Sequence, residues 1–203
     1  MHNPGRSKTP TTARSAIART ELVLGGQKSG KSRRAEGLAA NWLSRDASHQ
    51  AFLIATAQAF DAEMQARIER HQADRLQRVP GMTTLEVPLL LADAILAHSQ
   101  PQTLLVVDCL TLWLTNLLMP FQAPDMPGLV ATEQIALLVN AVGQARGPVV
   151  LVGNEIGLGV IPLGHEVRAF VDALGNLNQT LAQNCERVTF MAAGLPLVLK
   201  EPA

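Results

Sequence analysis

The sequence predicts a three-layer α/β domain, with a mainly parallel sheet and helices on both of its faces. Two observations lead to this prediction. Short apolar runs alternate with helical patterns along the chain, as in parallel sheets joined by crossover helices. The apolar runs are also nearly continuous, which is typical of strands buried on both faces. With 203 residues, 47% of them hydrophobic and 17% charged, the chain can bury the core of one such domain.

The expected elements follow one another in a regular order. Strands are expected at residues 21–24, 51–56, 83–87, 104–108 and 148–152, and a terminal strand pair at 187–192 and 197–200. Helices are expected at 32–43, 61–78, 89–98, 110–119, 131–144 and 167–185, with a Pro-containing loop at 122–128. Asp61 is the expected N-cap of the second helix, and Pro80-Gly81 ends that helix. Ligands of such sheets bind beyond the carboxyl ends of the strands, so functional residues are expected there.

The composition limits the partners that the chain can have. Lys and Arg together number 17 and so do Asp and Glu, which gives no support for binding to nucleic acid or to an anionic membrane surface. No apolar run approaches the ~20 residues that span a bilayer. Cys109 and Cys185 are too few for a disulfide framework, and we expect two buried thiols in a reducing cytoplasm.

The first 19 residues differ from the rest and are expected to form a flexible basic extension before a domain at 20–203. This segment carries Arg6, Lys8, Arg14 and Arg19 and no acidic residue. It lacks the apolar core of a secretory signal, whereas a transit peptide of similar composition stays an alternative.

A phosphate-binding loop is the strongest motif in the chain. Its residues are Gly25, Gly26, Gln27, Lys28, Ser29, Gly30, Lys31 and Ser32, which match the P-loop pattern in full. The motif follows an expected strand and opens an expected helix, as it must for backbone N–H groups and the helix N-terminus to surround a phosphate. Lys31 is expected to reach the β- and γ-phosphates, and the Ser32 hydroxyl to ligate Mg²⁺.

Asp108 ends the apolar run at 104–107, where P-loop enzymes place an acid that binds Mg²⁺ directly or through water. The alternative is a carboxylate that only caps the following helix. Beside the P-loop, the metal-binding interpretation is favoured.

The helix expected at 61–78 carries a stripe that changes from apolar to cationic. Met64, Ile68, His71 and Arg75 follow one another at helical spacing, with Arg67 alongside. A neutral imidazole among guanidinium groups is suited to attack on a phosphate, with His71 as the nucleophile. A half-exposed histidine on a polar helix is the alternative that periodicity alone favours.

Several motifs taken together resemble one known family. They are the P-loop, residues 54–58 (IATAQ), 61–64 (DAEM), 67–71 (RIERH) with Arg75, 108–118 (DCLTLWLTNLL) and 154–162 (NEIGLGVIP). In this order they resemble the bifunctional adenosylcobinamide kinase and adenosylcobinamide-phosphate guanylyltransferase of cobalamin biosynthesis. The resemblance covers residues 21–200, nearly the whole chain beyond the N-terminal extension.

The resemblance implies a P-loop NTPase-like (RecA-like) fold and two reactions. A kinase step would move the γ-phosphate of ATP or GTP to adenosylcobinamide. A second step would pass GMP from GTP through His71 to adenosylcobinamide phosphate. Beside the P-loop, the implied nucleotide contacts are Ala55, Thr56, Ala57, Gln72, Ala73, Asp74, Arg75, Glu86 and Asp108. Glu86 is aligned less securely, because residues 76–82 form a longer segment than in some members. The family also implies a homo-oligomer, with a trimer as the expectation.

Two other functional classes remain open from the residues alone. A single-function P-loop kinase for a small molecule would need no nucleophile at His71. A nucleotide-dependent switch or transport ATPase subunit would need a second ATPase signature or an interface that the sequence does not display. Glu155 follows the strand at 148–152 and could either position a hydroxyl or hold the glycine-rich segment after it.

Overall fold

The computed structural model describes residues 17–59, 61–120 and 130–202. Most of the expected N-terminal extension and the expected loop at 122–128 lie outside these ranges. The strands are β1 (Thr20–Gly25), β2 (Gln50–Ala55), β3 (Met82–Glu86), β4 (Thr103–Asp108), β5 (Val149–Val152), β6 (Arg187–Ala192) and β7 (Leu195–Lys200). The helices are α1 (Lys31–Leu43), α2 (Ala62–Arg78), α3 (Leu91–His98), α4 (Leu110–Leu118), α5 (Ala131–Gln144) and α6 (His165–Asn184).

These strands form one sheet in the order β3-β2-β4-β5-β1-β6-β7. Neighbouring strands from β3 to β6 are parallel, and β7 is antiparallel to β6. The predicted mainly parallel sheet with a C-terminal strand pair is therefore confirmed. The order places β5 between β1, which leads into the P-loop, and β4, which ends at Asp108.

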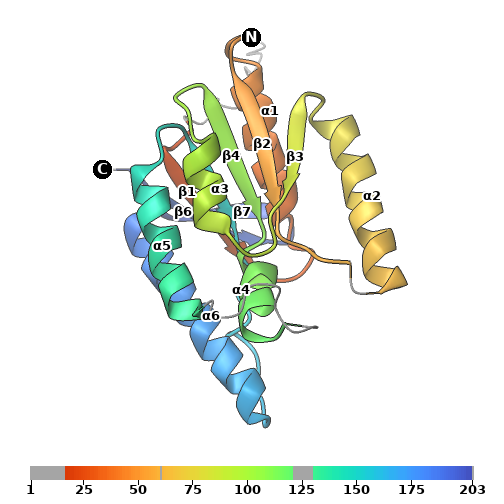
Figure 1. Cartoon of the computed structure of the whole chain (residues 1–203), viewed down its shortest axis with the longest axis vertical. Coiled ribbons are helices and arrows are strands. Elements are labelled where there is room, and N and C mark those ends of the chain that lie inside the picture. The colour runs from red at the N-terminus through yellow and green to blue at the C-terminus, as the bar shows by residue number, and fades with distance from the viewer. Residues whose placement is uncertain (1–16, 60, 121–129, 203) are drawn as a thin grey trace, which may run out of the picture.

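Two apolar layers enclose the sheet. On one face the strands pack against α3, α4, α5 and α6, with the ring of Trp113 fully buried among them. On the other face Ala35, Leu38 and Ala39 of α1 pack with Val79, just beyond α2, and with the opposite side chains of the strands. Figure 1 shows α4 beyond the carboxyl ends of the strands, and α2 at the β3 side of the sheet. The predicted layers are confirmed.

The observed boundaries lie close to the expected ones, with three shifts of two residues. Helix α3 begins at Leu91 rather than 89, α6 at His165 rather than 167, and β7 at Leu195 rather than 197. The β7 shift has a clear cause, because Ala193 (φ 51°) and Gly194 (φ 80°) make a tight turn that joins β6 to β7 at once. Asp61 caps α2 as expected, since its Oδ1 accepts a hydrogen bond of 2.7 Å from the Met64 N–H. Within the described ranges, no helix has the length and apolar character needed to cross a membrane.

Candidate active site

The P-loop lies between β1 and α1 and uses backbone conformations that favour glycine. Gly25 has φ 151° and Gly30, the N-cap of α1, has φ 102°. A Cβ on Gly25 would lie 2.4 Å from the Met191 carbonyl oxygen and 2.7 Å from Ser29 Oγ. Only glycine therefore fits where the loop leaves the sheet. The first N–H groups of α1 are left to face a ligand, as an anion site requires.

Lys31 lies across this loop. Its side chain is buried, and its ammonium group donates a hydrogen bond of 2.6 Å to the Gly26 carbonyl. Burial lowers the pKa of Lys31, and the nearby Cys109 and Asp108 oppose that shift. Asp108 is thus close enough to act electrostatically on the P-loop lysine, and the two predicted residues share one site.

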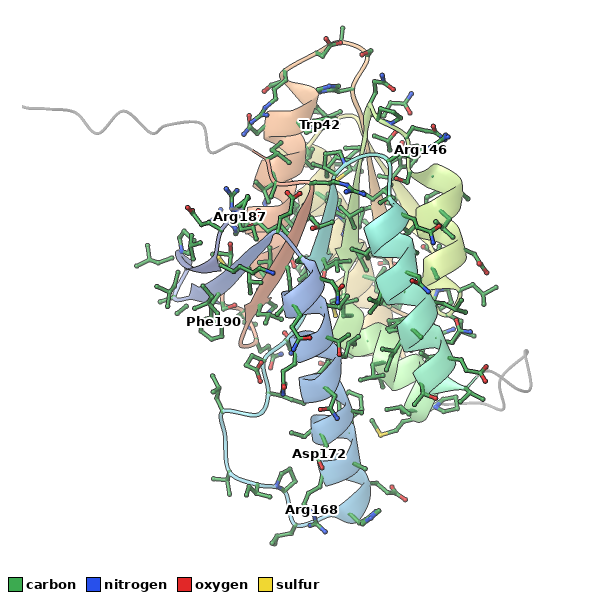
Figure 2. All side chains as sticks on the ribbon, turned by 90° about the vertical axis from the view of Figure 1, so that its left-hand side faces the viewer. Trp42, Arg146, Arg168, Asp172, Arg187 and Phe190 are labelled. Carbon is green, nitrogen blue, oxygen red and sulfur yellow. The ribbon has the colours of Figure 1, made fainter. Side chains whose placement is uncertain are left out.

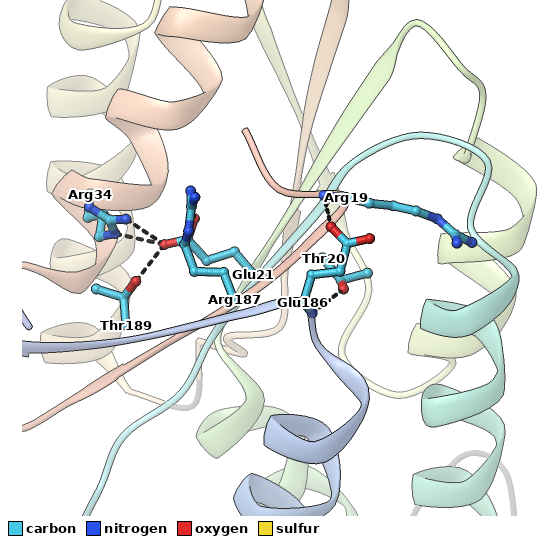
Figure 3. A network of polar contacts seen from close by, with 7 residues as sticks. All are labelled: Arg19, Thr20, Glu21, Arg34, Glu186, Arg187 and Thr189. Carbon is cyan, nitrogen blue, oxygen red and sulfur yellow. Dashed lines mark hydrogen bonds and ion pairs between the residues drawn. The ribbon is translucent and has the colours of Figure 1, made fainter. Parts of the chain in front are cut away.

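The helix that carries Lys31 is tied to the sheet by a buried acid. Glu21 of β1 is 1% exposed and accepts hydrogen bonds from Arg34 of α1 at 2.7 and 2.9 Å and from the Thr189 hydroxyl at 2.9 Å. Arg187 of β6 lies 3.8 Å from the other carboxylate oxygen. Figure 3 shows these side chains meeting around Glu21 from three elements. Because Arg34 is one turn beyond Lys31, this network fixes the start of α1 against β1.

Thr56 connects the ends of β2 and β4. Its hydroxyl donates to the Cys109 carbonyl (2.7 Å) and accepts from the Cys109 N–H (2.9 Å), and the side chain is fully buried. Asn116 of α4 donates to the backbone carbonyls of Thr56 (2.8 Å) and Pro88 (3.0 Å). The Thr56 side chain thus links the two strand ends, and the nucleotide contacts of Ala55, Thr56 and Ala57 stay a prediction.

Arg75 brings α2 to the site. It is 9% exposed, donates to the Thr84 hydroxyl at 3.2 Å and lies 3.9 Å from Glu36 of α1. Burial lowers the pKa of Arg75, while Asp108 and Glu36 oppose the shift. A cavity of about 440 Å³ opens between α2 and β3 and is lined by Gln72, Arg75, Leu76, Met82, Thr84 and Glu86. Three residues predicted to contact the nucleotide, Gln72, Arg75 and Glu86, therefore share one cavity.

The remaining predicted residues of α2 face outward to different degrees. His71 and Ala73 are exposed, and Asp74 pairs with Arg78 at 3.0 Å. The exposure of His71 agrees with the alternative that periodicity favours, because burial of Arg75 and Val79 turns Gln72 inward rather than His71. Within the described residues, no hydrogen bond or ion pair joins the His71 ring to the P-loop. The Arg67 side chain lies outside the described part. The nucleophilic role of His71 stays a prediction.

Glu155 lies at the same edge as the P-loop. Its N–H donates to the Gly25 carbonyl at 3.1 Å, and its carboxylate accepts from the Gly157 N–H at 3.2 Å. Asn178 of α6 reaches Glu155 Oε2 at 3.4 Å and the Asn154 carbonyl at 3.1 Å. Sequence reasoning missed Asn178, although a polar residue within the apolar stripe Phe170, Leu174, Leu177 and Leu181 was a usable signal.

Comparison with known proteins identifies the group to which this site belongs. A sequence model of the CobU family, described as "Cobinamide kinase / cobinamide phosphate guanyltransferase", matches residues 21–199. The chain belongs to this family. It is 48% identical over 180 residues to the "Bifunctional adenosylcobalamin biosynthesis protein CobP" of Pseudomonas aeruginosa, which covers 89% of this chain and 96% of that protein. It is 36% identical over 187 residues to the CobU protein of Escherichia coli, covering 88% of this chain and 98% of the relative.

A solved structure supports the fold of this CobU-family chain. The flagellar accessory protein FlaH from Methanocaldococcus jannaschii matches 92% of this chain and 80% of its own, with a TM-score of 0.50 and 10% sequence identity. At that identity the likeness concerns the fold alone. It agrees with the predicted RecA-like P-loop architecture.

The donors at this CobU-family site suit a magnesium ion that is shared with a nucleotide. Across the described residues, no group of three or more His, Cys, Asp or Glu side chains could hold a metal by itself. Mg²⁺ takes few protein ligands and is completed by water and substrate phosphates. The hydroxyl of Ser32, which follows Lys31, and the Asp108 carboxylate are hard oxygen donors of this kind. Asp108 pairs with Val152 of β5, which pairs with Val23 of β1, so the acid lies at the same sheet edge as the loop.

Proposed function

We propose that this chain carries both activities of its family. It phosphorylates adenosylcobinamide with ATP or GTP, and then transfers GMP from GTP to adenosylcobinamide phosphate, giving adenosylcobinamide-GDP and pyrophosphate. The family match over residues 21–199 carries this proposal, because it spans the P-loop, His71 and the NEIGLGVIP segment together.

In the kinase step, the P-loop backbone and Lys31 hold the β- and γ-phosphates. The substrate hydroxyl oxygen bonds to the γ-phosphorus, the bond from that phosphorus to the β-phosphate oxygen breaks, the nucleoside diphosphate leaves, and the hydroxyl proton passes to solvent. The fixed positive charge of Lys31 and of the helix N-terminus stabilises charge on the phosphate oxygens without reorganisation. Ser32 and Asp108 would hold Mg²⁺, which supplies further neutralisation of the leaving phosphate when bound.

In the transfer step, His71 is the nucleophile. A ring nitrogen bonds to the α-phosphorus of GTP and pyrophosphate leaves, which gives a guanylyl-histidine. An oxygen of the cobinamide phosphate then bonds to the same phosphorus, and the bond to the histidine breaks. The intermediate replaces one difficult displacement by two easier ones. Gln72, Arg75 and Glu86 line the cavity beside this helix and are proposed to contact the nucleotide, with Ala55, Ala57, Ala73 and Asp74 near them.

Further features belong to the same proposal. The protein acts in the cytoplasm as a homo-oligomer, with a trimer as the working assumption, and it has no nucleic-acid partner. The expected extension at 1–19 precedes the catalytic domain at 20–203, but its last residues join the domain, because Ala18 is buried and Arg19 donates to the carbonyls of Gly143 and Ala145. Size measurement in solution tests the oligomeric state, and activity after removal of residues 1–16 tests the extension.

The decisive experiment separates the two activities. Incubation of the protein with GTP labelled at the α-phosphorus is expected to leave an acid-labile, alkali-stable label on the protein, and His71→Ala is expected to abolish it. Kinase activity with adenosylcobinamide is expected to survive in His71→Ala. A label that persists in that variant would rule out His71 as the nucleophile, and absence of any label with intact kinase activity would favour a single-function kinase.

A further inference from the structure

A second hollow lies away from the cavity that contains Arg75. It has a volume of about 560 Å³ and lies between the segment 156–162 and one face of α6. Figure 2 shows this segment running outward from the sheet and returning beside the end of α6 that carries Arg168 and Asp172. None of the residues that we assign to phosphate binding lines this hollow, which we call the α6 pocket.

The two walls of the α6 pocket differ in chemistry. One wall is apolar and open to solvent, with Val160 96% and Ile161 76% exposed. The other wall comes from α6, where Asp172, Asn176 and Gln179 recur at helical spacing on one face and are exposed. Within the described residues, the side-chain amides of Asn176 and Gln179 make no hydrogen bond. This combination suits a ligand with an apolar body and a rim of hydrogen-bonding groups.

A segment that is anchored by hydrogen bonds at its two ends joins the pocket to the phosphate site. Its segment starts next to Glu155, whose N–H is bonded to Gly25 of the P-loop at 3.1 Å. At its far end, the guanidinium group of Arg168 donates to the carbonyl of Pro162 at 2.9 Å and also to that of Leu163. A molecule in the pocket therefore lies along a segment that begins beside the P-loop phosphate site.

A glycine in the middle of α6 forms part of the pocket wall. Gly175 lines the pocket, and a Cβ at this position would have no atom within 4 Å. Glycine within a helix costs about 0.5–1 kcal/mol relative to alanine. No contact inside the described chain requires glycine here, and the same is true of Gly143 in α5. Gly175 differs from Gly143 because it lines the pocket, where its backbone is open to a ligand.

We propose that the α6 pocket binds the corrin macrocycle of the acceptor substrate. The apolar ring surface lies against Val160 and Ile161, and the amide side chains of the ring exchange hydrogen bonds with Asn176 and Gln179. The hydroxyl-bearing arm then extends past Glu155 to the P-loop. This inference rests on the proposed function, because it takes cobinamide as the acceptor. It adds the surface that recognises the part of cobinamide that does not react.

The test fills the pocket from the helix without touching the phosphate site. Gly175→Leu places a side chain in the hollow. Gly143→Leu is the matched control, because a Cβ on Gly143 of α5 also meets no atom within 4 Å but Gly143 does not line the pocket. Leucine favours the helix over glycine, so neither replacement is expected to lower the thermal unfolding temperature. The probe is adenosylcobinamide itself, measured by equilibrium binding and by its KM in the kinase assay.

We expect Gly175→Leu to weaken adenosylcobinamide binding by about tenfold or more, since lost contacts of about 1.4 kcal/mol already give that factor. The KM for GTP and the labelling of the protein by GTP are expected to stay within about twofold of wild type, and Gly143→Leu to match wild type throughout. Gln179 is exposed, and Gln179→Ala is also expected to weaken adenosylcobinamide binding.

Unchanged corrinoid binding in Gly175→Leu and Gln179→Ala would overturn the inference while leaving the proposed function intact. A change of oligomeric state in Gly175→Leu, with corrinoid affinity unaltered, would also overturn it and would show that a second copy covers this surface. If wild type bound adenosylcobinamide without phosphorylating it, the proposed kinase activity would fail, and the binding comparison between the variants would still decide the inference.

Discussion

Replacement of Glu21 by glutamine tests how strongly the P-loop helix is fixed to the sheet. The carboxylate of Glu21 is 1% exposed and accepts two hydrogen bonds from Arg34, whose side chain is 18% exposed. The amide of Glu21→Gln keeps an acceptor oxygen but removes the negative charge, so the guanidinium group of Arg34 stays largely buried without its anion. Removing one partner of a buried ion pair costs about 3–5 kcal/mol. We expect Glu21→Gln to lower the free energy of unfolding by about 3 kcal/mol, the lower end of that range, because the amide oxygen still accepts.

The measurement is urea-induced unfolding of wild type and variants at low and high salt. At about 2–4 °C per kcal/mol for a domain of this size, the expected loss corresponds to a thermal shift of roughly 6–12 °C. Asp74→Asn is the matched control, because it removes the acid of an exposed pair with Arg78 whose side chains are 47% and 39% exposed. Asp74→Asn is expected to change the free energy of unfolding by no more than about 0.5 kcal/mol, and this change is expected to decrease at high salt. The loss in Glu21→Gln is expected to be the same at low and high salt, because that pair is buried. A loss below about 1 kcal/mol in Glu21→Gln would refute the argument that burial makes this pair strong.

Two further predictions concern the strand ends and the thiols. Thr56→Val keeps the shape of the side chain but leaves the Cys109 N–H without its partner, while the Cys109 carbonyl keeps only the hydrogen bond from the Trp113 N–H. We therefore expect urea unfolding to show a loss of about 1–3 kcal/mol, and a loss within about 0.5 kcal/mol would contradict this role of the hydroxyl. Burial raises the pKa of Cys185 to about 12 and that of Cys109 to about 11, so native protein at pH 8 is expected not to react with a disulfide reagent, whereas unfolded protein exposes two reactive thiols. Native Cys185 holds its proton more tightly than unfolded Cys185, so the stability that this thiol supplies is complete below pH 9 and declines as the pH rises towards 12. The difference in free energy of unfolding between wild type and Cys185→Ala, measured in urea, is therefore expected to shrink between pH 8 and pH 11. A difference that grows with pH would contradict a raised pKa in the native state.

Much of the fold was readable from the sequence because its signals are local. The P-loop motif sets the end of β1 and the start of α1, and Asp61 caps α2 through its own side chain. The start of β7 was misplaced because Ala193 takes a positive φ that alanine rarely adopts, so the Ala193-Gly194 pair gave a weak turn signal. Local pattern alone could not show that β7 follows β6 without a gap.

The site was less predictable because long-range packing sets the direction of each side chain. Helical spacing put His71 in line with Met64, Ile68 and Arg75 but left its exposure open. In the structure Arg75 is buried against Glu36 and Thr84, and this packing leaves His71 exposed and turns Gln72 inward. Glu36 gave no signal as the partner of Arg75, since an acid within a helix is usually solvated. Asn178 was missed for a similar reason, because its importance depends on a contact with Glu155, 23 residues away.

The sheet order has a consequence for how this protein assembles. The P-loop after β1, Thr56 after β2, Asp108 at the end of β4 and Glu155 after β5 become neighbours only once those parallel strands have paired across long stretches of intervening chain. Such non-local pairing is slow, because loop closure must be achieved before the contacts compensate for it. Nucleotide affinity should therefore emerge late in folding, when the sheet is complete. A bound triphosphate should slow hydrogen exchange in the central strands, because it stabilises the folded chain against global unfolding.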